Sequence, residues 1–190
     1  MKIKSIAAIC KKAKRVMILN HCSRTGTVTQ FIGDGVAYYP VYDLPLLDEE
    51  CVLTIFDIPE KQRENWTTMC GVEPVGLHLE DTDTGEYFLE ELGVSFALNG
   101  VQVKPFRAKG GVLFVNSKYP APFSDVRDIV QFFERRLDSG QSYVVAKAGF
   151  MMQAVIMPFQ AQETSLVQEL HKLVQLIDGK TEEKHDGKRV

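Results

Sequence analysis

The residues that most often carry catalysis or bind metals are dispersed along this chain. Its four histidines, at positions 21, 78, 171 and 185, are isolated from one another. His21 and Cys22 are the single adjacent His/Cys pair, and because neighbouring strand residues point to opposite faces, such a pair seldom forms a dyad or shares a metal. The four cysteines form no CxxC pair. We therefore predict neither a nucleophile–base pair nor a metal site.

Two segments rich in glycine or acid lack the spacing of ligand sites. Gly33-Asp-Gly35 is too short to cradle a phosphate and indicates a bulge or tight turn. Segment 80–86, EDTDTGE, lacks the ligand periodicity and the closing glutamate of an EF-hand loop, which favours a solvated hairpin tip. The carboxylate clusters at 48–50 and 90–91 have no partner base. We predict no cofactor and no catalytic residue; a small enzyme whose site these patterns miss remains an alternative.

The composition is that of an ordinary globular protein. Hydrophobic residues make up 45% of the chain and charged residues 25%. The formal net charge of -3 gives no global signature of nucleic-acid binding, although a local basic face is compatible with it. Lysines interrupt the first apolar run, unlike a signal peptide, and no stretch of about 18 apolar residues is present to span a bilayer. We expect a reduced, cytoplasmic protein with no membrane partner.

The pattern of apolar residues predicts an α+β fold. Helical spacing predicts helices over residues 3–15, 57–69, 124–137 and 162–177. β-type runs predict strands at 16–19, 28–32, 36–41, 52–56, 75–79, 87–89 and 112–115, and in two segments between 143 and 159. Asn99-Gly100, which separates two further apolar runs at 94–98 and 101–106, predicts a hairpin.

Several single residues are predicted to lie in the core. Cys10 is on the apolar side of the first helix, and Cys51 adjoins an apolar run. Met69, with Trp66, is expected on the inner side of helix 57–69. Tyr38 and Tyr39 are adjacent in a strand, so one must face inward, and we favour core packing over stacking on bases.

The two ends of the chain show the same order of elements. Helix 3–15 leads into Val-Met-Ile-Leu and later into Val-Ala-Tyr-Tyr-Pro-Val. Helix 124–137 leads into Tyr-Val-Val-Ala and later into Ala-Val-Ile-Met-Pro-Phe. This predicts two similar halves that share a sheet surface. The alternative is chance agreement between two generic α+β segments.

The segment Phe114-Val-Asn-Ser-Lys-Tyr119, the predicted helix after Ser124 and the ending Val155-Ile-Met-Pro-Phe159 resemble the last domain of bacterial DNA sliding clamps. In that family a similar turn leads into a helix, the domain closes on Met-Pro, and each domain contains two similar halves. The chain departs from the family at Pro120 and Pro122, which replace leucines. It also holds only one such domain and continues beyond the usual last strand.

The resemblance implies helices that contact DNA phosphates through Lys and Arg without reading sequence. The first helix fits this role, because its lysines and the following arginine can lie opposite its apolar face. The second helix fits less well, because its arginines are mixed with acids. The alternative for both helices is that the charged residues form a solvent-exposed face beside the core, without a role in DNA binding. The predicted DNA-binding residues are Lys4, Lys11, Lys12, Lys14, Arg15, Arg127, Arg135 and Arg136.

We therefore expect a clamp-like α+β domain of two helix-plus-sheet halves, about 1–100 and 101–160, although two small domains sharing a core would also suit the length. An extra amphipathic helix (161–178) and a disordered charged tail (179–190) would follow it. The expected function is non-catalytic binding of double-stranded DNA or replication proteins. The alternative is a protein-interaction module without a DNA role. It would bind a partner protein, or a second copy of the chain to form a homo-oligomer, through Leu166, Leu170, Leu173 and Ile177.

Overall fold

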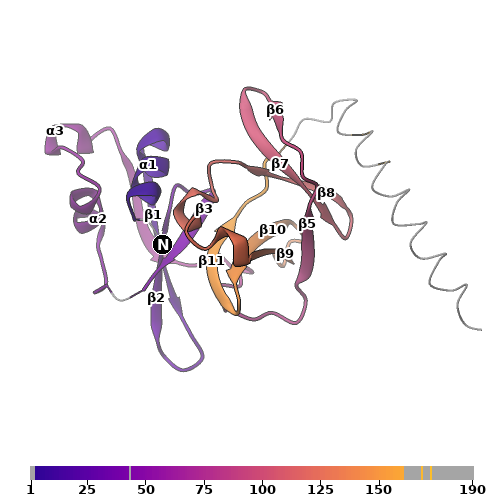
Figure 1. The fold of residues 1–190 in the computed structure, drawn as a ribbon. Helices are drawn as coiled ribbons and strands as arrows, with labels where there is room; N and C mark the ends of the chain where they lie inside the picture. Colours follow the sequence, from indigo (N-terminus) through magenta and orange to yellow (C-terminus); the bar gives the residue numbers. More distant parts are fainter. Residues whose placement is uncertain (1–2, 43, 161–167, 169–171, 173–190) are drawn as a thin grey trace, which may run out of the picture.

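The chain forms three helices and a large sheet in the computed structural model, which describes residues 3–42, 44–160, 168 and 172 (Figure 1). The helices are α1 (Ile3–Ala13), α2 (Glu49–Ile55) and α3 (Glu60–Arg63), with 3-10 turns η1 (Ala121–Phe123) and η2 (Arg127–Ile129). The strands are β1 (Arg15–Cys22), β2 (Val28–Gly33), β3 (Ala37–Val41), β4 (Thr67–Val72), β5 (Tyr87–Glu91), β6 (Phe96–Leu98), β7 (Val101–Ala108), β8 (Gly111–Asn116), β9 (Val130–Arg136), β10 (Ser142–Ala148) and β11 (Met151–Ile156). The predicted α+β class is confirmed.

The strands form an 11-stranded sheet in the order β4-β1-β2-β3-β11-β10-β9-β5-β7-β6, with β8 paired to β7 off this path. Neighbouring strands are antiparallel apart from β4 and β1, which run parallel. The consecutive strands β1, β2 and β3 meet the consecutive strands β9, β10 and β11 where Tyr38 of β3 lies opposite Val155 of β11. The first three and the last three strands of the described structure are thus joined in the middle of the sheet (Figure 1).

The middle strands are buried on both faces. α1 and α2 cover one face, over the largest apolar cluster, which contains Tyr39. The loop 73–86 covers the opposite face, where its Leu77 and Leu79 pack with Tyr38. Both tyrosines are therefore core residues, as predicted, because each face of the sheet has its own covering layer. Among the described residues, the structure contains no helix of the length and apolar character needed to span a membrane.

α1 forms close to its predicted limits. Ile6, Ile9 and Cys10 are buried at helical spacing, which gives the helix one apolar stripe toward the sheet. The helix ends at Lys14, whose φ of 50° lies in the left-handed region and whose amide donates to the Lys11 carbonyl at 3.3 Å. β1 follows without a connecting loop, so the charged end of α1 lies directly at the start of a strand.

The predicted helix at 124–137 is wrong, because the chain there forms η2 and then strand β9. Phe132 packs on one face of the sheet, 4.8 Å between ring centroids from Phe106. Phe133 packs on the other face, 5.9 Å from Phe88. A strand covered on both faces has no polar–apolar alternation, so its apolar residues can also match a helical spacing. Within the described residues, α1 therefore has no counterpart helix in 101–160.

Between residues 49 and 72 the predicted strand and the predicted helix are both wrong. The predicted strand at 52–56 is helix α2, where the Asp48 side chain caps the helix by accepting from the Cys51 amide at 2.8 Å. The predicted helix at 57–69 contains only the short α3 and the start of strand β4. Trp66 does pack against the core, whereas Met69 is 55% exposed.

The turns were predicted better than the elements beside them. Asn99 and Gly100 both have positive φ, 50° and 76°, as a two-residue hairpin between β6 and β7 requires. The Gly33-Asp-Gly35 segment is the tight turn between β2 and β3, and Gly35 has a φ of 89°. The predicted strand at 75–79 is part of a loop.

Thiol reagents are expected to reach Cys22, Cys51 and Cys70 in the native protein and to modify Cys10 slowly. Cys51 should react more slowly than Cys22 and Cys70, because its side-chain hydrogen bond with Asp48 raises the pKa of its thiol. The three are exposed, so the prediction of a core position for Cys51 is wrong, whereas Cys10 is buried. Burial, with a smaller contribution from the Asp34 charge, raises the pKa of the Cys10 thiol from 9.0 to about 12, and the thiolate is the reactive species. Mass spectrometry of the native protein at pH 8 should show three modified sites, with Cys10 reacting after denaturation.

Equal rates for all four cysteines in the native protein would contradict this burial. The same pKa shift has a stability consequence. Because the folded-state pKa lies above the unfolded value, the neutral thiol's contribution is complete below about pH 9 and is lost as the pH rises toward about 12.

Candidate functional site

Four of the predicted DNA-binding residues lie at or near the junction of α1 and β1, and a fifth, Lys4, lies in the first turn of α1. We call them together the α1 basic surface: Lys4, Lys11, Lys12, Lys14 and Arg15. All five are exposed. The lysines of the last turn lie where the carbonyl ends of the helix give a partial negative charge, which favours cations there. The local sequence thus has a structural reason to gather positive charge at this end of α1.

Arg15 lies on a different side of this surface from the lysines of α1. It is the first residue of β1, and Met17, two positions on, packs on the face covered by the loop 73–86. The Arg15 side chain lies against Gly35, where an added Cβ would be 3.3 Å from the Arg15 Cδ. The basic surface therefore wraps around the end of the sheet, instead of forming one helix face as the sequence predicted.

The α1 basic surface is not neutralised by carboxylates. In the part of the chain that the structure describes, none of its five cations is in an ion pair. Most other cations are paired: Arg63 with Glu50, Lys104 with Glu91, Arg107 with Glu90, Lys118 with Asp34, Arg135 and Lys147 with Glu86, and Arg136 with Glu134. Unpaired cations thus follow one another closely in sequence at this surface, whereas the other unpaired cations of the described residues are separated along the chain: Arg24, Lys61, Lys109, Arg127 and Lys172.

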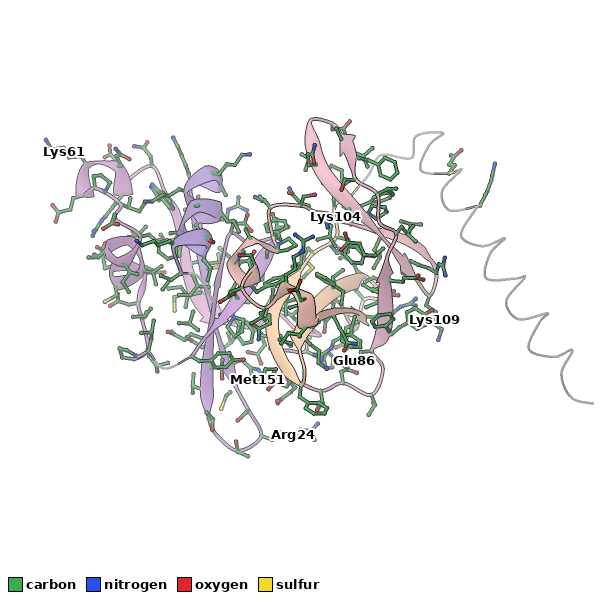
Figure 2. The ribbon with its side chains drawn as sticks, in the orientation of Figure 1. Arg24, Lys61, Glu86, Lys104, Lys109 and Met151 are labelled. Carbon is green, nitrogen blue, oxygen red and sulfur yellow. The ribbon has the colours of Figure 1, made fainter. Side chains whose placement is uncertain are left out.

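Exposed cations elsewhere are dispersed. Arg24, Lys61 and Lys109 are exposed and have no ion pair among the described residues. Figure 2 shows them well separated, with Lys61 beside α3, Lys109 at the far end of the sheet and Arg24 in the turn after β1. They do not form a second basic surface, and they are suitable control positions for charge changes.

The second predicted group of cations does not gather on one surface. Arg127 is exposed in η2. Arg136 is 57% exposed at its side chain, but its Nε lies 3.5 Å from a Glu134 carboxylate oxygen. Arg135 is only 1% exposed, so its assignment as a DNA-binding residue is wrong. Because 130–136 is a strand, successive arginines point to opposite faces and cannot share a helical surface.

Arg135 instead fixes the loop 73–86 to the sheet. Its guanidinium donates to the carbonyls of His78 at 3.1 Å, Glu80 at 2.7 Å and Asp81 at 3.3 Å. It also donates twice to one Glu86 oxygen, at 3.1 and 2.8 Å. A planar fork of five donors suits this task, since one buried side chain satisfies several acceptors of an irregular segment.

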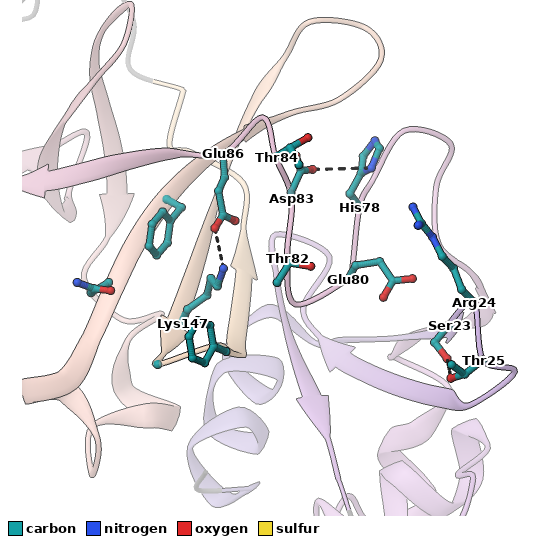
Figure 3. Close-up of a pocket in the computed structure, with 14 residues that line it drawn as sticks. Ser23, Arg24, Thr25, His78, Glu80, Thr82, Asp83, Thr84, Glu86 and Lys147 are labelled. Atoms are coloured by element: carbon teal, nitrogen blue, oxygen red, sulfur yellow. Dashed lines mark hydrogen bonds and ion pairs between the residues drawn. The ribbon is translucent and has the colours of Figure 1, made fainter.

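A cleft of about 920 Å³ lies beside this loop, and its lining includes Arg24, His78, Phe133 and Lys147. Figure 3 shows Lys147 and Glu86 directed toward each other at one side of the cleft. The Lys147 Nζ is 2.7 Å from the Glu86 Oε1 and lies 4.9 Å from the centre of the Phe133 ring. The cation and carboxylate of this pair satisfy each other, so the pair offers no unpartnered base or nucleophile.

Histidines also hold the acidic loop. His21 is buried, with its Nδ1 3.0 Å from Glu73 and its Nε2 3.5 Å from Glu80. His78 is half exposed and lies 3.9 Å from both Asp83 and Asp138. Within the described residues no group of three or more His, Cys, Asp or Glu side chains is arranged to hold a metal ion. His21 therefore contacts the loop from β1, whereas His78 is part of the loop and lies near Asp138 outside it.

The Asn-Ser-Lys-Tyr turn has a structural role in the core. Lys118 and the Tyr119 hydroxyl donate to the same oxygen of buried Asp34, at 3.0 and 3.2 Å. The Tyr39 hydroxyl donates to the Tyr119 carbonyl at 2.9 Å. Burial, followed by the Asp34 charge, raises the pKa of the Tyr39 and Tyr119 hydroxyls. The turn thus links two distant parts of the chain through Asp34, a partner that the sequence did not indicate.

The predicted partner-binding residues Leu166, Leu170, Leu173 and Ile177, and the charged tail 179–190, lie outside the described residues. Comparison of the chain with protein-family models, curated proteins and solved structures finds no match in any of the three. The function is therefore argued from the chain's own geometry.

Proposed function

We propose that the protein is a non-catalytic binding module whose α1 basic surface contacts the sugar-phosphate backbone of double-stranded DNA. The observation that carries this proposal is the group of exposed cations along α1 and at the start of β1, none of which is in an ion pair among the described residues. The chain has a net charge of -3, and most of its other described cations are paired. Cations that a protein leaves unpaired at one surface are free to replace the counterions of a polyanion.

The composition of this surface favours phosphate contact over base reading. Its groups are four ammonium groups and one guanidinium, whereas base discrimination uses bidentate donors and acceptors such as Arg, Asn or Gln aimed into a groove. Binding would therefore be largely independent of sequence. An α1 length of 11 residues also limits contact to a short stretch of backbone.

We also retain the sliding-clamp kinship as a proposal. The sheet order β1-β2-β3 followed by β11-β10-β9 is a palindrome of two three-stranded groups, which supports an arrangement of two related halves. η1 packs against α1 in the same apolar cluster, which supports a position for this 3-10 turn related to that of a second helix. Contact with replication proteins belongs to this same proposal and has no separate surface assigned to it.

Charge reversal tests the DNA-binding proposal. The triple change Lys11→Glu, Lys12→Glu and Arg15→Glu should weaken binding of a fluorescein-labelled mixed-sequence duplex about 100-fold at low salt, because it removes three cations and adds three anions near phosphates. Fluorescence anisotropy would give the two dissociation constants. Equal binding by the wild type and this triple variant would overturn the proposal.

A matched control separates the surface from the net charge. Arg24→Glu, Lys61→Glu and Lys109→Glu change the net charge by the same amount at exposed and dispersed positions. With both triple variants also compared at 0.1 M salt, where long-range charge is screened within about 10 Å, this variant should weaken binding no more than about threefold. An equal loss in both triple variants would show non-specific attraction instead of a defined surface.

A further inference from the structure

The outer edge of β4 lacks the features that normally prevent strands from pairing with other chains. β4 is the terminal strand of the sheet and pairs with β1 alone among the described residues. Its sequence, TTMCGV, contains no charge and no proline, and its register with β1 is continuous, without a bulge. Charged residues, prolines and bulges are the usual means of blocking an edge. This edge is therefore chemically suited to pair with another strand.

The backbone of β4 shows which residues would make that pairing. The Thr67 amide donates to the Lys14 carbonyl at 3.1 Å, so Thr67 directs its hydrogen-bonding groups toward β1. Alternate residues of an extended strand direct these groups to opposite sides. Thr68, Cys70 and Val72 therefore present their N–H and C=O groups at the open edge.

We propose that β4 pairs with β4 of a second copy of this chain, antiparallel and about a twofold axis at Cys70. This register places Thr68 opposite Val72 of the second copy, and Cys70 opposite Cys70. Every outward-facing residue of the strand then exchanges both hydrogen bonds with a counterpart, for about six bonds across the interface. The sheets of the two copies become one continuous sheet.

The side chains of β4 complement each other in this register. Met69, which is 55% exposed, lies opposite Gly71 of the second copy. A Cβ built on Gly71 would meet no atom within 4 Å, so there is room above the glycine for the methionine. Val72, which is 78% exposed, gains cover from the facing Thr68. Thr67 lies opposite Glu73, so no like charges face each other. These features favour a second copy of the chain over an unrelated strand.

The proposed dimer does not depend on DNA binding, but it would determine where the two copies of the α1 basic surface lie. A twofold axis perpendicular to the sheet keeps corresponding faces of the two copies on the same side. Both α1 helices would then lie on one face of the joined sheet, beside the β1 strands that neighbour β4. Failure of the dimer would leave the charge-reversal result unaffected, so the two proposals are tested separately.

Sedimentation equilibrium of the full chain over a range of concentrations tests the dimer. The wild type and Cys70→Ser should dimerise with similar dissociation constants. Cys70→Lys should raise the dissociation constant at least about tenfold, because it places two lysines directly opposite each other. A wild type that stays monomeric at all concentrations, or a dimer that Cys70→Lys leaves unchanged, overturns the proposal, and the latter result would indicate another interface.

Cross-linking gives a second test that does not depend on folding of the lysine variant. Paired residues across antiparallel strands have Cα atoms about 5.5 Å apart, so a short bis-maleimide should join two copies through Cys70. The cross-linked dimer should form in a Cys22→Ser/Cys51→Ser variant, which retains Cys70, and should be lost when Cys70→Ser is added to that variant. Cross-linking that persists in the triple variant would contradict the register.

Discussion

Replacement of Arg135 by methionine is expected to lower the free energy of unfolding by about 3–5 kcal/mol. Arg135 is 1% exposed and donates to the Glu86 carboxylate and to three carbonyls of the loop 73–86. Methionine fills similar space but leaves these acceptors buried without their donor, which carries the full cost of desolvation. Chemical denaturation monitored by circular dichroism would measure the change.

Arg136→Met is the matched control for this prediction. Arg136 adjoins Arg135 in the same strand but is 57% exposed at its side chain, so its loss should change stability by less than about 0.5 kcal/mol. Similar effects of the two substitutions would show that Arg135 does not anchor the loop. Arg135→Lys should recover little, since a single ammonium cannot reproduce the planar fork.

Asp34→Ala should destabilise the protein by about 3 kcal/mol or more. Asp34 is 3% exposed. One carboxylate oxygen accepts from the amides of Val36 and Ala37, both at 3.0 Å. The other oxygen accepts from Lys118 and from the Tyr119 hydroxyl. Its removal leaves four donors without their acceptor and disconnects the β2–β3 turn from the turn after β8. Thermal and denaturant unfolding would measure the loss.

Two further variants identify the source of that loss. Asp34→Asn keeps one carbonyl oxygen for the two backbone amides, so it should cost less than Asp34→Ala. Lys118→Met removes a partly exposed ammonium, 29% accessible at its side chain, and should cost about 1 kcal/mol. If Asp34→Ala cost no more than Lys118→Met, the carboxylate would be a minor contact and this account of the turn would be wrong.

Local sequence signals predicted the elements that have one buried and one exposed face, and the turns that need particular residues. α1 has a polar face and an apolar face, so its helical spacing is visible. The Asn99-Gly100 and Gly33-Asp-Gly35 turns need positive φ, which the glycine and asparagine residues indicate. β9 was mistaken for a helix because both of its faces are covered and the alternation is lost.

The role of each charged residue depended on tertiary structure that the sequence does not contain. Arg135 and Arg136 are adjacent and identical in type, yet one is buried against a loop about 50 positions earlier in the chain and the other is exposed. The sequence indicated that the cations near α1 are exposed, because they lie opposite its apolar residues, but it did not indicate that Arg15 lies on another side of the sheet. Neither the partly buried Glu86–Lys147 pair nor the role of Asp34 had such a local signal.

The salt dependence of DNA binding tests the central claim most directly. If the α1 basic surface neutralises phosphates, the logarithm of the binding constant should fall linearly with the logarithm of salt concentration. A slope of about -3 to -4 is expected for four contacting cations, with equal affinity for two duplexes of unrelated sequence. A binding constant that does not change with salt, or the absence of binding at about 20 mM salt, where screening is weakest, would contradict the account.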